Sequence, residues 1–541
     1  MDQLTIPAVF QAAVAGYPDG EALVFPDTRL SYRQLDERAQ CFATSLMGLG
    51  IRPGDAVGIL MPNAIDNVAT FLAATIAGAF CVPINSRFRP RELAHVIADS
   101  GMRVLVTSDI IADHVDFAER LGEAFTELEK AAIGTTPALE HAPGLEHIVM
   151  LGKSEQPGML TEQQFIAAGA QIDKADQESR SSAITSTQYA MMLYTSGTTA
   201  MPKGCAIKHG QLVSVSSNIA ERLGLEHGDR LWNALPMFHA SSLLPLLAAF
   251  HKQATFISLV HFDPGEALQQ LYNENVTLAW PAYTTIWQPV LTHQDFDPDR
   301  LGQLRGLLCV GPRETLEMME KALPRARVMS CYGLTECSGL PVMPWFTDTA
   351  KVRYGTCGRP MEGIEVQIRD PEIGEELAAG KRGALWMRGD YVIDGYWNDP
   401  IKTAQSFDPE GWFNTGDMAS MDDEGYLYFH GRLKDTLKVG GENVAAVEVE
   451  AYLSTHPSIK IAAVVGIPDE KYGEVPVAFI EFRPGKTAQS EELIAFCRKG
   501  LAGFKVPRLV REVSEWPMSA TKIRKEELRT SLLQELGTAT N

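Results

Sequence analysis

The sequence predicts an α/β protein of two or more domains, with a parallel, doubly wound sheet and a small α+β unit at the C-terminal end. The chain has 541 residues, too long for one ordinary hydrophobic core. Short apolar runs alternate with amphipathic helical patterns through the first part, as they do in parallel sheets. A charged, glycine-rich stretch at 431–443 then precedes a shorter tail, which indicates a linker between two domains.

The first elements follow from local pattern. A hairpin is expected where two apolar runs flank the turn at 26–28. Helices are expected at 33–47, 64–77 and 90–99, and strands at 56–61, 80–84 and 104–107. The more polar and less periodic stretch 127–186 is expected to be a connecting region.

The later elements continue the same alternation. Strands are expected at 189–193, 231–235, 276–280, 307–310 and 328–331, with a helix at 209–223. In the tail, helices are expected at 447–453, at 491–501 and near the end, and strands at 461–465 and 477–482. The tail therefore predicts a small α+β unit.

Composition excludes several classes of partner. The net charge of −20 argues against a nucleic acid, since phosphate binding requires a basic face. Eight cysteines without paired spacing indicate free thiols in a reducing cytoplasm. The N-terminus lacks a basic region followed by an apolar stretch, so no signal peptide is expected. Gly78 and Pro83 interrupt the longest apolar run, which therefore predicts a buried helix and strand and no membrane span.

The segment 194–204 has the chemistry of a phosphate-binding loop. Its sequence is Tyr-Thr-Ser-Gly-Thr-Thr-Ala-Met-Pro-Lys-Gly, and it follows a predicted strand. Small hydroxyl residues and glycines let N–H and O–H groups approach an anion, and Lys203 supplies positive charge. The order of Lys203, Gly204 and Cys205 does not match a Walker A loop. A polar surface loop between two strands is the alternative interpretation.

This string closely resembles the phosphate loop of the adenylate-forming superfamily: acyl-CoA synthetases, adenylation domains of peptide synthetases and luciferases. The resemblance covers nearly the whole chain, with the motifs in the family's order. It implies a large N-terminal domain of several α/β subdomains with doubly wound sheets and a small, mobile α+β C-terminal domain. It implies that ATP is bound by the loop residues Thr195, Ser196, Gly197, Thr198, Thr199 and Lys203. Thr195 and Lys203 are also implied in catalysis.

The segment 332–336, Tyr-Gly-Leu-Thr-Glu, resembles the second family motif. The resemblance implies that Tyr332 stacks on adenine beside Gly333 and that Thr335 binds the adenylate phosphate. Glu336 would hold Mg²⁺, a hard cation that needs oxygen ligands beside phosphate. Without the resemblance, the segment is a strand-to-loop turn with a surface glutamate.

Two later segments complete the nucleotide and thiol sites that the resemblance implies. Asp417, in the segment 411–417, would accept hydrogen bonds from both ribose hydroxyls. Arg432 would contact the ribose, and Lys434 would be the hinge between domains 1–432 and 433–541. Lys438, Gly440 and Gly441 would lie in the loop that approaches the thiol acceptor.

The acyl pocket is expected at the carboxyl ends of the strands, where open α/β sheets bind ligands. His239 follows one predicted strand, and the resemblance implies that it gates the acyl pocket. Loops beginning at Pro281 and Gly311 would line the acyl and adenine pockets, although the second reads Gly-Pro-Arg in place of the usual glycine-rich text. The pocket would be set by residues 239–245, 280–287, 309–314 and 329–341.

Lys522 aligns with the lysine of the family's closing motif, which reaches the substrate carboxylate during adenylation. The glycine that normally precedes this lysine is absent, and Lys525 is the alternative candidate.

The resemblance implies an acid–thiol ligase that forms an acyl-adenylate from ATP and a small carboxylic acid, with Mg²⁺, and transfers the acyl group to coenzyme A. Coenzyme A is preferred because the chain ends without a carrier domain. The alternatives are a stand-alone enzyme that loads a carrier-protein thiol, luciferase-type oxygenation and a catalytically silent binding protein. A homodimer is open, since the sequence does not specify the oligomeric state.

The acid itself is expected to be apolar and bulky: medium- or long-chain, alicyclic, steroid-derived or aryl. Small residues after His239 are followed by large apolar ones, and 280–287 adds aromatic rings. No Lys or Arg falls in 239–250 or 276–290, which disfavours a dicarboxylate.

Overall fold

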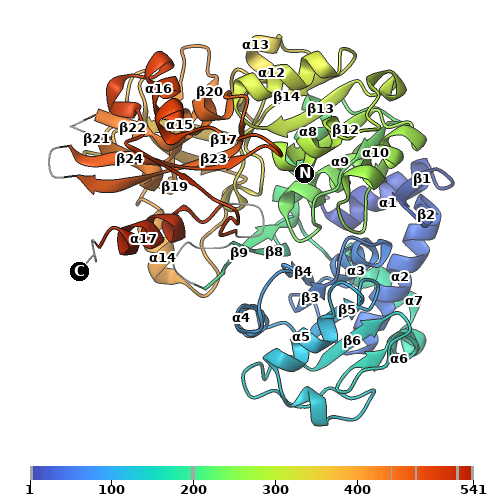
Figure 1. Cartoon of the computed structure of the whole chain (residues 1–541). Helices are drawn as coiled ribbons and strands as arrows, with labels where there is room; N and C mark the ends of the chain where they lie inside the picture. The colour runs from blue at the N-terminus through green and yellow to red at the C-terminus, as the bar shows by residue number, and fades with distance from the viewer. Residues whose placement is uncertain (1–3, 196–200, 440–441, 470–471, 519–522, 538–541) are drawn as a thin grey trace. The chain divides into compact units, whose positions relative to one another are not determined.

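Figure 1 shows the computed structural model of the chain, which describes residues 4–195, 201–439, 442–469, 472–518 and 523–537. The chain divides into two compact units. The first comprises Met1–Ile364 with Arg388–Gln405, and the second comprises Glu365–Met387 with Ser406–Asn541. Parallel sheets dominate the large first unit and antiparallel pairing dominates the small second one, so the predicted fold class is confirmed.

One seven-stranded sheet of the first unit has the order β7-β6-β5-β3-β4-β8-β9. All neighbours pair in parallel except β8 and β9, which form an antiparallel hairpin. Its strands are β3 (Ala56–Leu60), β4 (Phe80–Pro83), β5 (Val104–Ser108), β6 (His147–Leu151), β7 (Leu160–Thr161), β8 (Tyr189–Thr195) and β9 (Lys203–Lys208). Its helices are α3 (Ile65–Ile76), α4 (Pro90–Ser100), α5 (Phe117–Ala124), α6 (Glu162–Ala168) and α7 (Lys174–Ser182).

The stretch 127–186 is not the connecting region that its polarity suggested. It contributes β6 and β7 to the edge of the sheet and also contains α6 and α7. The buried apolar run 148–151 of β6 has only four residues, too few for hydrophobic periodicity to reveal the strand. Its pairing with β5 therefore decides the conformation of this segment.

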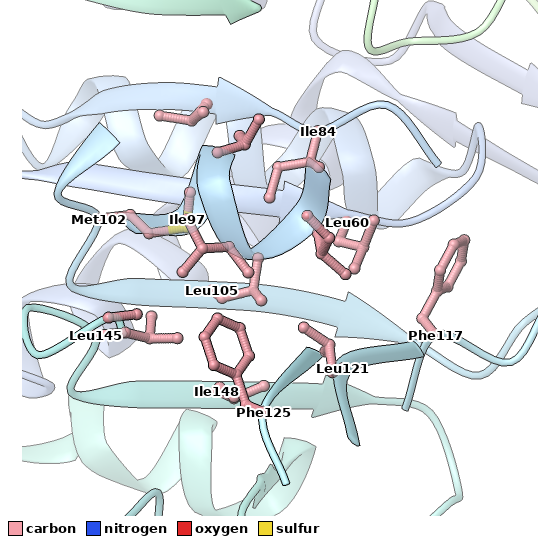
Figure 2. Packing of buried hydrophobic residues seen from close by; sticks show 14 of the residues in the cluster. Leu60, Ile84, Ile97, Met102, Leu105, Phe117, Leu121, Phe125, Leu145 and Ile148 are labelled. Atoms are coloured by element: carbon pink, nitrogen blue, oxygen red, sulfur yellow. The ribbon is translucent and has the colours of Figure 1, made fainter. Parts of the chain in front are cut away.

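A hydrophobic core joins this sheet to the helices on one of its faces. Figure 2 shows Leu105 of β5 and Ile148 of β6 in the same cluster as Ile97 of α4 and Leu121 of α5. Each of these four side chains is at most 1% exposed. Burial of a side chain of this size contributes about 1.5–3 kcal/mol, so the cluster is a principal source of stability for the sheet.

The other seven-stranded sheet has the order β14-β13-β12-β10-β11-β1-β2 and is parallel apart from β2. Its strands are β1 (Glu21–Phe25), β2 (Thr28–Ser31), β10 (Arg230–Trp232), β11 (Thr255–Ile257), β12 (Leu278–Tyr283), β13 (Gly306–Val310) and β14 (Arg327–Met329). Its helices are α1 (Ile6–Gly16), α2 (Tyr32–Gly48), α8 (His209–Arg222), α9 (Ala240–Lys252), α10 (Pro264–Asn273), α11 (Thr284–Leu291) and α12 (Arg313–Ala322). The short elements β15 (Val342–Met343), α13 (Ala350–Arg353), β16 (Arg359–Pro360) and α14 (Pro400–Ser406) complete this part of the chain.

The second unit contains a four-stranded sheet and a five-stranded sheet. Their strands are β17 (Ile364–Arg369), β18 (Gly383–Gly389), β19 (Phe413–Met421), β20 (Leu427–Arg432), β21 (Thr436–Val439), β22 (Glu442–Ala445), β23 (Ile459–Asp469), β24 (Gly473–Phe482) and β25 (Leu509–Glu512). Its helices are α15 (Ala446–Ser454), α16 (Ser490–Gly500) and α17 (Lys525–Glu535). The helices and strands expected for the tail are confirmed as α15, β23, β24, α16 and α17.

The charged, glycine-rich stretch 431–443 indicated only a linker, but after Arg432 it also contributes a strand with a buried face, β21. Leu437 and Val439 occupy alternate positions of β21, and their side chains are buried at 3% and 2% exposed. The strand is held because β21 pairs with β22 and meets β24 at its end.

Two further expectations concern the thiols and the membrane. All eight cysteines lie in the described part of the chain and are free thiols, and seven of them are buried. Within the described ranges, no helix is both long enough and apolar enough to cross a bilayer.

Candidate active site

The phosphate-loop candidate joins the two antiparallel strands of a hairpin. Thr195 ends β8 and Lys203 begins β9, and these two residues are register partners. Residues 196–200 lie outside the described residues, as do the predictions for Ser196, Gly197, Thr198 and Thr199. The pairing of β8 with β9 therefore brings Thr195 and Lys203 together at the two ends of the loop.

A tyrosine that the sequence analysis missed connects Lys203 to Glu336. The Nζ atom of Lys203 lies 5.6 Å from the centroid of the Tyr396 ring, within cation–π range. The Tyr396 hydroxyl donates a 2.9 Å hydrogen bond to Oε1 of Glu336. One aromatic side chain thus touches both the cation and the carboxylate that the motifs singled out.

Backbone contacts hold Tyr396 in this position. Tyr396 forms a β-bridge with Cys205 of β9, and the N–H of Trp397 donates to the carbonyl of Gly204 at 2.8 Å. The indole N–H of Trp397 also donates to the carbonyl of Asp99 at 3.1 Å. The only sequence signal was the aromatic pair at 396–397, which core packing explains equally well.

Burial makes Cys205 an unsuitable nucleophile. It raises the pKa of the Cys205 thiol well above its ordinary value, and the nearby Glu336 carboxylate raises it further. Because the thiolate is the reactive form, this cysteine is inert at neutral pH.

The second motif forms a tight turn after β14. Tyr332 is buried and its N–H donates to the carbonyl of Val342 at 3.0 Å. Gly333 is exposed, and a Cβ added there would come within 2.2 Å of the Gly339 carbonyl oxygen. Thr335 and Glu336 follow in a short 3₁₀ helix, Thr335–Cys337. Position 333 therefore requires glycine, because any side chain there would clash with the backbone of Gly339.

The acyl-pocket candidates lie at the carboxyl ends of β10, β12 and β13. His239 is the N-cap of α9, and its ring lies 4.6 Å from the Phe238 ring. Gly311 follows β13, where an added Cβ would meet Thr284 Cγ2 at 2.6 Å. The start of α9 also lies close to the second motif, because a Cβ at Gly339 would meet Leu244 Cδ1 at 2.6 Å.

Asn233, which sequence reasoning also missed, joins the segments that carry these candidates. It is fully buried, and its Nδ2 donates to the carbonyls of Ser241 at 3.0 Å and Trp280 at 3.2 Å. Its Oδ1 accepts from the N–H of Leu235 at 2.9 Å. One side chain therefore ties the end of β10 to the first turn of α9 and to β12.

The second unit brings together the two residues assigned to ribose. Asp417 of β19 and Arg432 of β20 are register partners. The Nε of Arg432 lies 2.9 Å from Oδ1 of Asp417, which is 4% exposed at its side chain. The cation holds the carboxylate in place, while Arg432 itself remains 41% exposed at its side chain.

The remaining site predictions fall in less completely described parts of the second unit. Lys434 lies in the 3₁₀ helix Leu433–Asp435 and Lys438 lies in β21. Gly440, Gly441 and Lys522 lie outside the described residues.

The alternative to Lys522 has a structural partner. Lys525 begins α17, and its Nζ lies 2.6 Å from Oε1 of Glu450 on α15. Both side chains are at most 20% exposed. This ion pair gives Lys525 a role within the unit itself.

Glu336 suits a magnesium ion shared with substrate phosphates. In the described ranges no group of three or more His, Cys, Asp or Glu residues could hold a metal ion by itself. Mg²⁺ is usually bound by one or two carboxylates together with phosphate oxygens and water, and a single hydrogen-bonded glutamate fits that role.

Two protein-family models match the chain, and together they cover most of its length. The model of the AMP-binding enzyme family matches residues 10–397. The model of the AMP-binding enzyme C-terminal domain matches residues 448–522.

Curated relatives match the chain over nearly its full length. The chain is 34% identical to a 3-[(3aS,4S,7aS)-7a-methyl-1,5-dioxo-octahydro-1H-inden-4-yl]propanoyl:CoA ligase of Mycobacterium tuberculosis, covering 98% of the chain and 99% of the relative. It is 32% identical to the putative acyl-CoA synthetase YngI of Bacillus subtilis, covering 98% and 97%. It is 33% identical to a feruloyl-CoA synthase of an Amycolatopsis species, covering 95% and 96%.

A solved structure supports the same relationship. The anthranilate CoA ligase AuaEII, in complex with anthranoyl-AMP, superposes with a TM-score of 0.86 at 26% identity and covers 98% of each chain.

Proposed function

The chain belongs to the AMP-binding enzyme family, and its relatives are named as acyl-CoA synthetases and ligases, which are acid–thiol ligases. We propose that it is an ATP-dependent ligase that joins an apolar carboxylic acid to coenzyme A. The acid would first become an acyl-adenylate with release of pyrophosphate. The thiol of coenzyme A would then take the acyl group and release AMP.

The observation that carries this proposal is the arrangement of Lys203, Tyr396 and Glu336. A cation and a carboxylate from distant parts of the chain share one tyrosine at 5.6 and 2.9 Å. The cation offsets phosphate charge and the carboxylate provides an oxygen ligand, which together are the chemistry of a nucleotide triphosphate site.

Adenylation joins two anions, so positive charge is its main requirement. An oxygen of the substrate carboxylate attacks the α-phosphorus of ATP, and the bond to the bridging oxygen of pyrophosphate breaks. Lys203 would lower the repulsion at the phosphates, and Lys522 would bind the attacking carboxylate. Mg²⁺ bound at Glu336 would supply further charge neutralisation.

Thioester formation uses the mixed anhydride made in the first step. The sulfur of coenzyme A attacks the acyl carbon, the bond to the AMP oxygen breaks, and AMP leaves. Lys438, Gly440 and Gly441 would lie in the loop that approaches the thiol. Because the two steps use different residues of the second unit, we expect a change of conformation at Lys434 between them.

An apolar, ring-containing acid is the proposed substrate class. Two relatives and one solved structure are named as CoA ligases or synthases for a bicyclic propanoate, for ferulate and for anthranilate, all of which carry rings. The segment that follows His239 in α9 is apolar, and Leu243, Leu244, Leu246 and Leu247 are each at most 1% exposed. Each buried CH₂ of a substrate contributes about 0.8 kcal/mol, so a large apolar acid gains most from such surroundings.

A panel of acids assayed for AMP formation tests the proposal. Acetate, octanoate, benzoate, cyclohexanecarboxylate and a steroid-derived acid would each be supplied with ATP, Mg²⁺ and coenzyme A. We expect acyl-CoA and AMP in equal amounts, with the highest kcat/KM for a ring-containing or long acid. Acetate as the best substrate would contradict the substrate class, and AMP without acyl-CoA would favour a carrier-protein thiol as the acceptor.

A further inference from the structure

Two buried donors beside Asn233 lack hydrogen-bond partners among the residues that the structure describes. They are the indole Nε1 of Trp280 and the hydroxyl Oγ of Ser242. Trp280 is 2% exposed and Ser242 is completely buried. A buried polar group without a partner destabilises the folded protein, so two in one region require an explanation.

Both donors belong to segments that are hydrogen-bonded to the same side chain, that of Asn233. Nδ2 of Asn233 donates to the carbonyls of Trp280 and of Ser241, the residue before Ser242. The end of β12 and the first turn of α9 therefore form a polar cluster at the carboxyl edge of the sheet.

A bulge sets the direction of this cluster. The pairing of β12 with β13 shifts register between Ala279 and Ala282, and Ala282 has a φ of 54°. A non-glycine residue rarely adopts this conformation, and bulges of this kind commonly re-aim side chains beside active sites. Ala279, just before the shift, belongs to the apolar cluster of the sheet, whereas Trp280, within it, is not a member of that cluster.

A comparison within the same sheet separates this cluster from ordinary core packing. Trp287 of α11 also has an unpartnered indole N–H among the described residues. It lies, however, within the apolar cluster and packs against the ring of Trp232 at 6.0 Å. Trp280 differs because a second donor without a partner among the described residues, the hydroxyl of Ser242, belongs to the same region.

The chemistry of the two donors specifies what they can bind. An indole N–H only donates, so its partner must be an acceptor. The segments 239–250 and 276–290 contain no Lys or Arg to balance a second carboxylate. The partner is therefore expected to be neutral, and a carbonyl oxygen on an otherwise apolar ring fits both donors and the apolar residues of α9.

We propose that Trp280 and Ser242 hydrogen-bond a ring ketone on the acyl part of the acid that this enzyme activates. The proposal rests on the proposed function, because it assigns the acid of that same reaction. The substrate class is thereby narrowed from apolar ring acids to apolar ring acids that carry a neutral oxygen acceptor.

Matched pairs of acids test this proposal. The kcat/KM of cyclohexylpropanoate would be compared with that of the same acid carrying a ketone at each possible ring position. The assay would use the full-length enzyme with ATP, Mg²⁺ and coenzyme A. We expect the kcat/KM of at least one ketone to exceed that of cyclohexylpropanoate by about tenfold to a hundredfold. The reason is that an acid without the ketone would leave the buried donors of the enzyme unpaired. Trp280→Phe and Ser242→Ala should each move the ratio of the two kcat/KM values toward one. Trp287→Phe is the control and should preserve the ratio.

The outcomes separate this proposal from the proposed function. A wild-type ratio near one overturns the ketone assignment, whether or not the variants fold. A ratio that falls equally in Trp287→Phe shows a general packing effect and overturns it as well. If no acid of either class yields AMP, the proposed function itself fails.

Discussion

Nδ2 of Asn233 donates a 3.0 Å hydrogen bond to the carbonyl of Ser241, the carbonyl that Pro245 leaves without its usual helical donor. In an α-helix the N–H of residue 245 would bond the carbonyl of residue 241, and proline has no N–H. Asn233 thus compensates for a proline inside α9 from a different element. The first turn of α9, which carries His239 and Ser242, depends on this side chain.

Asn233→Ala should lower the free energy of unfolding of the first unit by about 3 kcal/mol, because it leaves two buried carbonyls and the Leu235 N–H unpaired. In a Pro245→Ala background the helix supplies its own donor to Ser241, so the cost of Asn233→Ala should be smaller by about 1 kcal/mol. Urea unfolding of the wild type, both single variants and the double variant measures this coupling. Additive effects would show that the amide of Asn233 does not serve that carbonyl.

Tyr396→Phe should raise the Mg²⁺ concentration required for half-maximal pyrophosphate release. The variant keeps the ring beside Lys203 and removes only the hydroxyl that donates to Glu336. A hydrogen bond to a charged group contributes about 1.5–3 kcal/mol, which corresponds to an effect of about tenfold or more.

Tyr428→Phe is the control for that measurement. It removes a similar 2.9 Å hydrogen bond, from the Tyr428 hydroxyl to Oδ2 of Asp422, and lies outside every sequence motif. Its Mg²⁺ requirement should equal that of the wild type. Equal effects of the two substitutions would argue against a specific role for Tyr396.

Lys522→Ala should block adenylation and spare thioester formation from supplied acyl-AMP. Loss of one donor that stabilises developing charge typically costs about 10²–10³ in rate. Lys525→Ala should instead act on stability, because Lys525 is paired with Glu450 at 2.6 Å. The two half-reactions would be measured separately for both variants, and a selective loss of adenylation in Lys525→Ala would reverse the assignment.

Lys434→Pro should trap one conformation of the enzyme. Proline fixes φ near −65°, whereas a hinge residue must change its backbone angles. Near-normal pyrophosphate release in the first turnover with little acyl-CoA is the expected result of a rapid-quench experiment. Lys434→Ala should turn over at a rate close to that of the wild type, because it retains backbone freedom. Ordinary steady-state turnover of the proline variant would place the hinge elsewhere.

Gly333→Ala should weaken ATP binding, since its Cβ would come within 2.2 Å of the Gly339 carbonyl oxygen and displace the turn that follows Tyr332. Gly503→Ala is the control, because nothing lies within 4 Å of its added Cβ. The KM for ATP distinguishes the two variants, and we expect an increase only for Gly333→Ala. An unchanged KM in Gly333→Ala would remove this turn from the nucleotide site.

Most elements could be predicted from sequence because their patterns are local. The strands β3, β4 and β5 and the helices between them lie within two residues of their predicted bounds. The prediction failed for β6 and β21, whose short apolar stretches become strands by pairing with β5 and with β22. A short window of sequence contains no information about the partner strand. The conformation of these two segments is therefore determined by hydrogen bonding to neighbouring strands.

The sequence by itself determined the α/β class, the motif residues and the family, because each is a short string whose chemistry is complete within a few positions. Only the tertiary structure decided that Tyr396 touches both Lys203 and Glu336, and that Asn233 supports Ser241 and Trp280. These contacts join residues that are far apart in the chain. The Asn233 contacts exist because the carboxyl ends of the parallel strands β10 and β12 lie at one edge of a sheet, whereas Tyr396 is positioned by its bridge to Cys205 of β9.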